Sequence, residues 1–294
     1  MDSPNGELPR ASKPGLYVAS DGRELCYRHW VPLGFPRGYV VALHGIQSHA
    51  GWYEYSSSRL AEAGYDLRFL DRRGSGQNSE DRGHAAHSDR LINDVAQMLS
   101  EVCWLRDQMA SRVPVVLLGV SWGGTLAAAI AARRPELLDG LALLYPGLCA
   151  RVRPRWYQRW LLKLGESLGA GRKLIRIPLD DPALFTGESA WQEFLRTDPL
   201  ALHHATVSFL NASLALDAEA HARAEEISQP TLVMLAGQDQ IVDNEATRRY
   251  LNRLGTSQLE VKEYPEARHT LEFEPNREAI FSDLIDWLNA LPVR

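Results

Sequence analysis

The sequence predicts an α/β protein with a mostly parallel central sheet flanked by helices. Short apolar runs alternate along the chain with segments of helical spacing, and parallel strands need helical crossovers between them. The apolar runs, such as VPVVLLG and PTLVMLAG, are nearly continuous, which is typical of strands buried on both faces. With 294 residues, 45% hydrophobic and 23% charged, the chain is long enough for one such domain with an insertion.

Apolar runs and turn residues give the expected order of elements. Residues 1–14 are predicted to be a flexible leader, followed by the first part of the core domain over residues 15–146. Strands are predicted over residues 24–32, 38–45, 66–71, 113–119, 140–147, 230–237 and 259–265. Helices are predicted over residues 56–65, from about 88, after 121, over 244–254 and from about 276.

Residues 147–220 interrupt this alternation. They contain no convincing strand, are rich in Trp, Arg, Leu and Pro, and separate two strands of the expected sheet. We interpret them as a helical insertion, with the second part of the core domain over residues 221–294. Ligands of such sheets bind beyond the carboxyl ends of the strands, so an insertion at this edge is expected to cover the site as a cap or lid.

Composition argues against several classes of protein. No apolar segment resembles a signal peptide or reaches the roughly 18 residues of a membrane span, which predicts a cytoplasmic protein. Three widely spaced cysteines fit reduced thiols better than disulfides or a zinc site, and we expect neither a metal nor a cofactor. A net charge of −5 argues against nucleic-acid binding.

One serine lies between two glycines where a predicted strand meets a predicted helix. The segment GVSWG places Ser121 there, and small neighbours permit the strained turn of a nucleophile elbow. The same pattern also fits a simple strand-to-helix turn capped by a serine. A nucleophilic serine further requires a base and an acid that orients the base.

Both further groups follow in the order Ser, Asp, His. Asp239 comes just after a predicted strand, and His269 lies in the loop after the last strand. Asp243 is the alternative acid, but Asp239 is closer to the strand end. The sequence therefore predicts a triad of Ser121, His269 and Asp239.

Acyl transfer also needs donors that stabilise the developing oxyanion. The backbone N–H of Trp122 follows the nucleophile at the start of a helix. The segment ALHGIQSHAGW supplies a second candidate, because Gly45 allows a close approach and leaves the N–H of Ile46 free. Losing one such donor typically costs about 3 kcal/mol of transition-state stabilisation.

From Pro14 onward the chain resembles the α/β-hydrolases, and more narrowly their monoacylglycerol lipase and lysophospholipase branch (serine aminopeptidase-like hydrolases). The resemblance lies in the segments DGRELCYRHWVP, HGIQSHAGWY, AEAGYDLRFLDRRGSGQNSEDRGH, GVSWGG, AGQDQIVD and RHTLEFE. It implies the α/β-hydrolase fold, ester hydrolysis by Ser121, His269 and Asp239, and oxyanion donors at Ile46 and Trp122.

The chain departs from the family pattern at two sites. Val120 and Trp122 stand where the family usually has histidine and often methionine, and Gln47 and Ser48 stand where Gly and Glu are usual. Bulky Trp122 beside the nucleophile is expected to narrow the site.

These residues predict a serine esterase that cleaves a lipid with one acyl chain, a monoacylglycerol or a lysophospholipid, through an acyl-enzyme. An acyltransferase, a thioesterase or a small-ester carboxylesterase would use the same triad. A non-catalytic receptor that keeps the pocket for ligand recognition is the alternative from outside the enzymes, because fold alone does not settle function.

The start of the insertion is strongly basic. Residues 151–176 contain eight Lys or Arg residues against one Glu, a local charge of +7. A helix here would have an apolar face that includes Trp156 and Trp160 and a polar face that includes Arg155 and Arg159. Such a helix can lie on an anionic membrane. Alternatively, its apolar side packs over the active-site cleft and its arginines are merely solvated.

Overall fold

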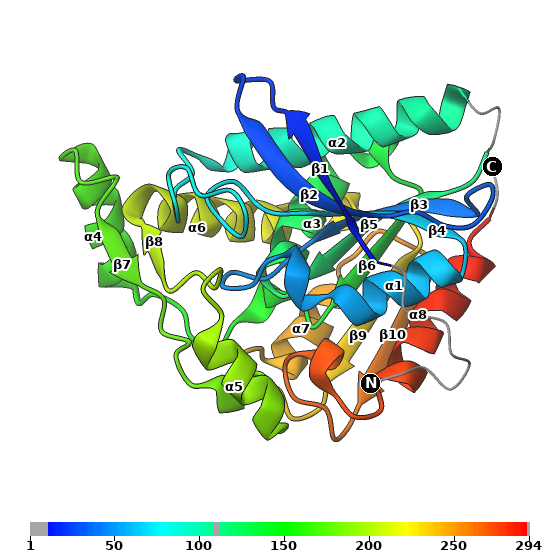
Figure 1. The fold of residues 1–294 in the computed structure, drawn as a ribbon. Coiled ribbons are helices and arrows are strands. Elements are labelled where there is room, and N and C mark those ends of the chain that lie inside the picture. Colours follow the sequence, from blue (N-terminus) through cyan, green and yellow to red (C-terminus); the bar gives the residue numbers. More distant parts are fainter. Residues whose placement is uncertain (1–10, 109–111, 293–294) are drawn as a thin grey trace.

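The computed structural model describes residues 11–108 and 112–292, which form one eight-stranded sheet covered by helices (Figure 1). The strand order is β1-β2-β4-β3-β5-β6-β9-β10. The strands are β1 (Lys13–Val18), β2 (Glu24–Trp30), β3 (Gly38–Leu43), β4 (Tyr65–Leu70), β5 (Val115–Val120), β6 (Gly140–Leu144), β9 (Thr231–Ala236) and β10 (Leu259–Tyr264).

The sheet is parallel from β4 to β10, and antiparallel pairing is confined to β1 and β2 at one edge. Every residue of β3, β4, β5, β6 and β9 is buried, which explains the nearly continuous apolar runs of all but β4, where Asp66 and Arg68 are buried as well. Seven of these strands lie where the sequence predicts strands. The prediction of a mostly parallel sheet flanked by helices is confirmed.

The expected leader over residues 1–14 overlaps a strand. β1 begins at Lys13 and pairs with β2, with Leu16 opposite Cys26. Residues 1–10 of the expected leader lie outside the described residues. The strand was not predicted because its Leu16 and Val18 side chains are exposed and only Tyr17 is buried, which removes the usual alternation.

Helices cover both faces of the sheet. α1 (Glu54–Glu62) and α8 (Arg277–Ala290) bury side chains in one apolar cluster, and α2 (Ser88–Gln108), α3 (Trp122–Arg133), α6 (Val207–Ala222) and α7 (Asn244–Leu251) do so in the other. Alternate residues of β5 belong to the two clusters, so Val115 and Leu117 face α3 while Val116 and Leu118 face away. The short 3-10 helices are η1 (Ala50–Trp52), η2 (Pro135–Leu137), η3 (Gly147–Cys149), η4 (Pro182–Leu184), η5 (Ala224–Glu226) and η6 (Leu271–Phe273).

The insertion begins after β6 and returns to the sheet at β9 (Figure 1). Besides α4 (Trp156–Ser167) and α5 (Ser189–Thr197), it contains a two-stranded antiparallel sheet of β7 (Leu174–Arg176) and β8 (His204–Thr206). The expectation of no strand is therefore wrong, because three-residue strands are too short to show a periodicity. α6 crosses the expected boundary at residue 220 and packs against α3.

α4 projects from the end of the molecule that is remote from α8 (Figure 1). None of its residues is buried, and Trp156 and Trp160 are 82% and 59% exposed. The alternative in which its apolar side packs over the cleft is therefore wrong. Among the helices in the described ranges, none combines the length and apolar content needed to cross a bilayer.

Candidate active site

Ser121 lies in a strained turn between β5 and α3. Its φ of 52° and ψ of −119° are rare for a residue with a side chain. Gly119 and Gly123 make this turn possible, because a Cβ on Gly119 would lie 2.6 Å from the Gly123 carbonyl oxygen and one on Gly123 would lie 2.5 Å from that of Leu43. The turn therefore requires glycine on both sides of Ser121.

The three residues of the predicted triad lie in contact. His269 Nε2 is 2.9 Å from Ser121 Oγ, and His269 Nδ1 is 2.7 Å from Asp239 Oδ2. The side chains of His269 and Asp239 are 2% and 0% exposed. With the proton on Nδ1 held by the carboxylate, Nε2 is free to accept the Ser121 proton.

The structure shows which of the two candidate acids contacts the histidine. The second oxygen of Asp239, Oδ1, accepts hydrogen bonds from the backbone N–H groups of Ile241 and Val242 at 2.8 and 2.9 Å, which fixes the carboxylate. Asp243 instead caps α7, where its side chain accepts from Ala246 N at 2.9 Å. Of the two aspartates, only Asp239 contacts His269.

The loop that carries Ile46 lies against the nucleophile. A Cβ built on Gly45 would be 3.4 Å from Ser121 Cβ and 3.7 Å from its Oγ, which places the Gly45 backbone in contact range of the nucleophile. Trp122 N is at the first position of α3, beside Ser121. The Trp122 ring turns toward α6, where its Nε1 donates to Ser213 Oγ at 3.1 Å.

The Arg72 side chain contacts both the Ile46 loop and the Trp122 ring. The sequence does not reveal this role. Its guanidinium donates to the carbonyl oxygens of Gly45 and Ile46 at 3.4 and 3.2 Å. It also lies 4.7 Å from the ring centroids of both Trp122 and Phe209. Burial lowers the pKa of Arg72 to about 9. The DRRG segment was part of the family resemblance, but nothing in its pattern indicates contact with two aromatic rings.

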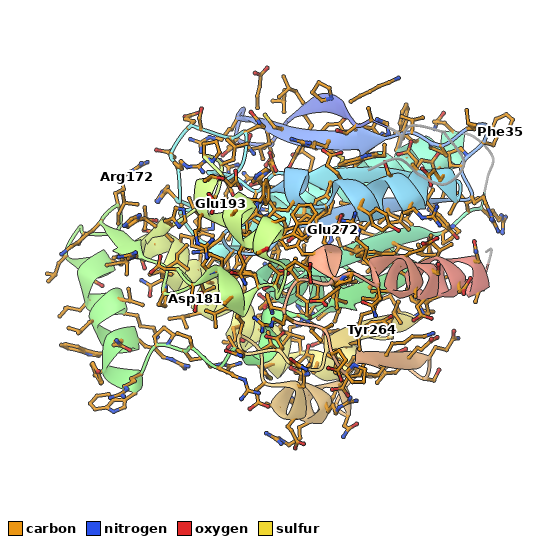
Figure 2. All side chains as sticks on the ribbon, turned by 60° about the horizontal axis from the view of Figure 1, so that its bottom comes forward. Phe35, Arg172, Asp181, Glu193, Tyr264 and Glu272 are labelled. Atoms are coloured by element: carbon orange, nitrogen blue, oxygen red, sulfur yellow. The ribbon has the colours of Figure 1, made fainter. Side chains whose placement is uncertain are left out.

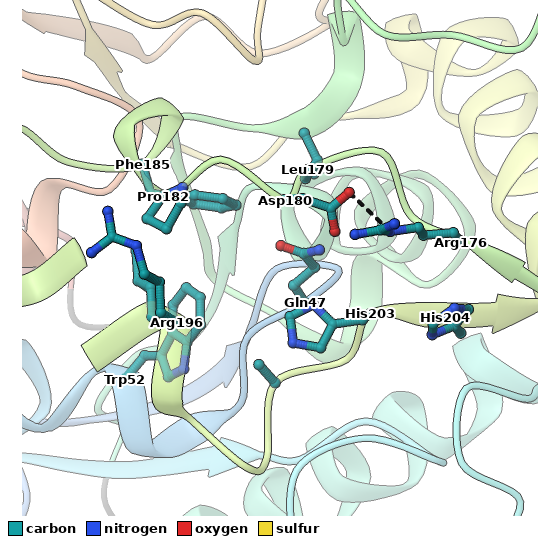
Figure 3. A pocket seen from close by; sticks show the side chains of 12 residues that line it. Gln47, Trp52, Arg176, Leu179, Asp180, Pro182, Phe185, Arg196, His203 and His204 are labelled. Carbon is teal, nitrogen blue, oxygen red and sulfur yellow. Dashed lines mark ion pairs between the residues drawn. The ribbon is translucent and has the colours of Figure 1, made fainter. Parts of the chain in front are cut away.

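A cavity of about 430 Å³ adjoins these groups (Figure 3). Phe185 lines it and places its ring edge-on to the His269 ring, with centroids 5.9 Å apart. Gln47, the residue after Ile46, also lines it, and the rest of the wall comes from Trp52 and from the insertion. Ser121, Asp239 and His269 do not line this cavity themselves; Phe185 connects its wall to the His269 ring, and Gln47 connects it to the Ile46 loop.

A buried carboxyl lies three residues beyond His269. Glu272 is 1% exposed, and its Oε1 accepts from the backbone N–H groups of Tyr55 and Ser56 at 2.9 and 3.0 Å (Figure 2). Burial raises its pKa to about 7. Sequence reasoning gave Glu272 no role, because burial of a single carboxylate has no signature in one sequence.

Within residues 11–108 and 112–292, no cluster of three or more His, Cys, Asp or Glu side chains is arranged to hold a metal ion. Cys26, Cys103 and Cys149 are free thiols. The site geometry thus consists of the serine, histidine and aspartate side chains and the backbone around them.

The chain is similar in sequence and structure to known lipases and a phospholipase. The chain is 25% identical over 276 residues to a monoacylglycerol lipase of Mycolicibacterium smegmatis, covering 92% of this chain and 95% of that protein. It is 23% identical over 256 residues to phospholipase YtpA of Bacillus subtilis, covering 84% and 93% of the two chains. The structure of a soluble variant of monoglyceride lipase from Saccharomyces cerevisiae superposes with a TM-score of 0.85 at 19% identity over 99% and 100% of the two chains, which shows the fold.

The sequence profile of the family described as serine aminopeptidase, S33, matches residues 34–276. This match spans most of the chain and includes the strands from β3 to β10, the elbow and the loop of His269. The predictions of the α/β-hydrolase fold and of a serine-type carboxylic ester hydrolase are confirmed. The chain belongs to the serine aminopeptidase S33 family of α/β-hydrolases.

Proposed function

We propose that Ser121 is the nucleophile of an ester hydrolase that acts on a lipid with a single acyl chain. The observation that carries this proposal is the continuous chain of contacts from Ser121 Oγ through His269 to Asp239, at 2.9 and 2.7 Å. Two relatives named as a monoacylglycerol lipase and a phospholipase support the substrate class.

In this mechanism His269 Nε2 takes the Ser121 proton while Oγ attacks the ester carbonyl carbon. The resulting oxyanion accepts from the N–H groups of Ile46 and Trp122. When the intermediate collapses, the alcohol leaves with the proton held by His269, and the acyl group stays on Ser121. Water then gives a proton to His269 while its oxygen attacks the acyl carbonyl; as the second intermediate collapses, His269 returns that proton to Ser121 Oγ and the fatty acid leaves.

The insertion over residues 147–220 supplies the substrate-covering cap in this proposal. Three contacts tie it to the core beside the proposed oxyanion loop. Asp198 Oδ2 accepts from Trp52 Nε1 at 2.7 Å and lies 3.1 Å from His49 Nε2. Leu202 N donates to the backbone oxygen of Gln47 at 2.9 Å. These contacts support an insertion that covers the site and stays attached to it.

We also propose that α4 docks on anionic membranes. Its apolar residues form an exposed patch of Trp156, Tyr157, Trp160, Leu161, Leu164 and Leu168. Within the part of the chain that the structure describes, Arg155 and Arg159 form no ion pair, so their charge is available to lipid phosphates. Arg172, near the same end of the insertion, is exposed but pairs with Asp81 at 2.6 Å (Figure 2).

The test is fatty-acid release from matched monoacylglycerol and lysophosphatidylcholine series of several chain lengths. We expect release by the wild type and none above background by Ser121→Ala. Release that survives in Ser121→Ala would contradict the proposed nucleophile. Labelling of Ser121 by a fluorophosphonate without release from either series would favour an acyltransferase, a thioesterase or a small-ester hydrolase, and no labelling would favour a receptor.

A further inference from the structure

Gln47 places an unpaired hydrogen-bonding group on the wall of the cavity. The residue is only 5% exposed, and its Nε2 has no hydrogen-bond partner among the described residues. Its backbone oxygen is fixed by Leu202 N at 2.9 Å. A buried amide without a partner is unfavourable unless a ligand pairs with it. The Nε2 donor of Gln47 is therefore open to a group that enters the cavity.

The insertion surrounds the same cavity with cationic and titratable groups. Arg176, Arg196, His203 and His204 all line it, against a single carboxylate, Asp180 (Figure 3). Asp180 pairs with Arg176 at 3.0 Å. Arg196 is about half exposed and pairs with Glu193 outside the lining at 3.3 Å. Exposed pairs of this kind are weak, so a more strongly charged ligand can replace them.

The donor set distinguishes between the head groups of single-chain lipids. A glycerol head group could satisfy the Gln47 amide, but it carries no charge with which to compete for Arg176 and Arg196, which pair with the exposed carboxylates of Asp180 and Glu193. A phosphate carries negative charge and several strong acceptor oxygens, and arginine side chains match its geometry. A half-turn of the Gln47 side-chain amide exchanges its oxygen and its NH2 group. An anionic ligand favours the orientation that presents the NH2 group.

We propose that the cavity binds the phosphate of a lysophospholipid head group, and that Gln47 donates a hydrogen bond to a phosphate oxygen. The inference rests on the proposed ester hydrolysis and specifies its substrate: a monoacyl glycerophospholipid is the preferred ester, and Gln47 with Arg196 determines that preference. Ser121, His269 and Asp239 perform the same chemistry on either class of ester.

The test compares 1-decanoylglycerol with 1-decanoyl-lysophosphatidylglycerol, each below its critical micelle concentration. We expect the wild type to have the higher kcat/KM for the phospholipid. Gln47→Leu keeps the side-chain volume and removes the donor, so the ratio of the two kcat/KM values should fall about tenfold, as for a hydrogen bond to a charged group. Arg196→Gln should lower the ratio in the same direction.

Gln258→Leu is the matched control, because Gln258 is exposed and lies remote from the cavity lining. This variant should keep the wild-type ratio. A wild type that prefers decanoylglycerol, or a Gln47→Leu variant that loses both activities equally, would overturn the inference and leave the proposed hydrolysis intact.

A soluble reporter separates the two proposals. If Ser121-dependent turnover of p-nitrophenyl butyrate persists while neither lipid is hydrolysed, the lipid substrate class itself is wrong. With this reporter, sn-glycerol 3-phosphate should inhibit the wild type more strongly than glycerol does. Gln47→Leu should remove that difference, and equal inhibition of the wild type by the two compounds would contradict phosphate binding.

Discussion

α3 and α4 are both 12-residue helices that begin with tryptophan, yet they have opposite environments. α3 buries ten of its residues against the sheet and α6, and α4 buries none. Small alanine side chains let α3 approach its neighbours closely, whereas α4 presents large aromatic and leucine side chains to solvent. The two helices therefore differ in what covers their apolar side chains: α3 packs against the sheet beside the nucleophile turn, and α4 leaves its apolar side chains exposed to solvent.

The largest expected effect is at the carboxyl end of the sheet, which α3 helps to build. Asp239→Asn should lower kcat by about 10⁴-fold, because the amide favours the wrong tautomer of His269. Asp243→Asn is the matched control, since asparagine caps a helix nearly as well as aspartate. Esterase kinetics on p-nitrophenyl butyrate checks both. Equal losses would show that the acid is misassigned.

The next largest difference between α3 and α4 should be in how much a truncated side chain lowers the free energy of unfolding. Ile130 in α3 is 0% exposed, so Ile130→Ala should lower the free energy of unfolding by roughly 2–5 kcal/mol. Leu161 in α4 is 54% exposed, and Leu161→Ala should change it by less than about 0.5 kcal/mol. Urea denaturation measures both values. Similar losses would mean that α4 packs against the protein in solution.

The buried carboxyl of Glu272 and the exposed carboxyl of Glu166 on α4 should also differ in how they make stability depend on pH. Burial raises the pKa of Glu272 to about 7 from an ordinary value of 4.5, so the folded state binds more protons than the unfolded state between these pH values. The contribution of Glu272 to stability should therefore fall by up to about 3 kcal/mol as pH rises from 4.5 to 7. Glu272→Gln should remove this component, whereas Glu166→Gln on exposed α4 should leave it in place. Denaturation at several pH values tests this, and an unchanged pH dependence in Glu272→Gln would contradict it.

The charges on α4 should have the smallest effect on the free energy of unfolding. Reversing Arg155 and Arg159 to Glu should weaken binding to anionic vesicles by at least about 30-fold, since each basic residue near such a surface contributes about 1 kcal/mol. Turnover of a short soluble ester and the free energy of unfolding should not change. The control is Arg248→Glu with Arg249→Glu on α7. Vesicle co-sedimentation measures the binding, and unaltered binding would refute docking by α4.

The sequence predicted the central sheet well because its strands are buried on both faces, and a continuous apolar run such as the one around Leu117 leaves little ambiguity. Ser121, Asp239 and His269 were predicted from their place after strand ends, and the structure brings them into contact. Only three-dimensional packing reveals the rest. β7 and β8 are too short for periodicity, and the amphipathic pattern of α4 could not say whether the chain itself covers its apolar face. Arg72 and Gln47 depend on contacts between distant segments.

The position of Arg72 has a consequence for evolution at this site. Its guanidinium touches the carbonyl oxygens of Gly45 and Ile46 on one side and the Trp122 ring on the other. The two residues proposed to stabilise the oxyanion are thus spaced by one side chain that does not line the cavity. Substitutions in the cavity wall can alter which ester enters without changing that spacing. Substrate range and catalytic geometry can therefore diverge independently among descendants of this chain.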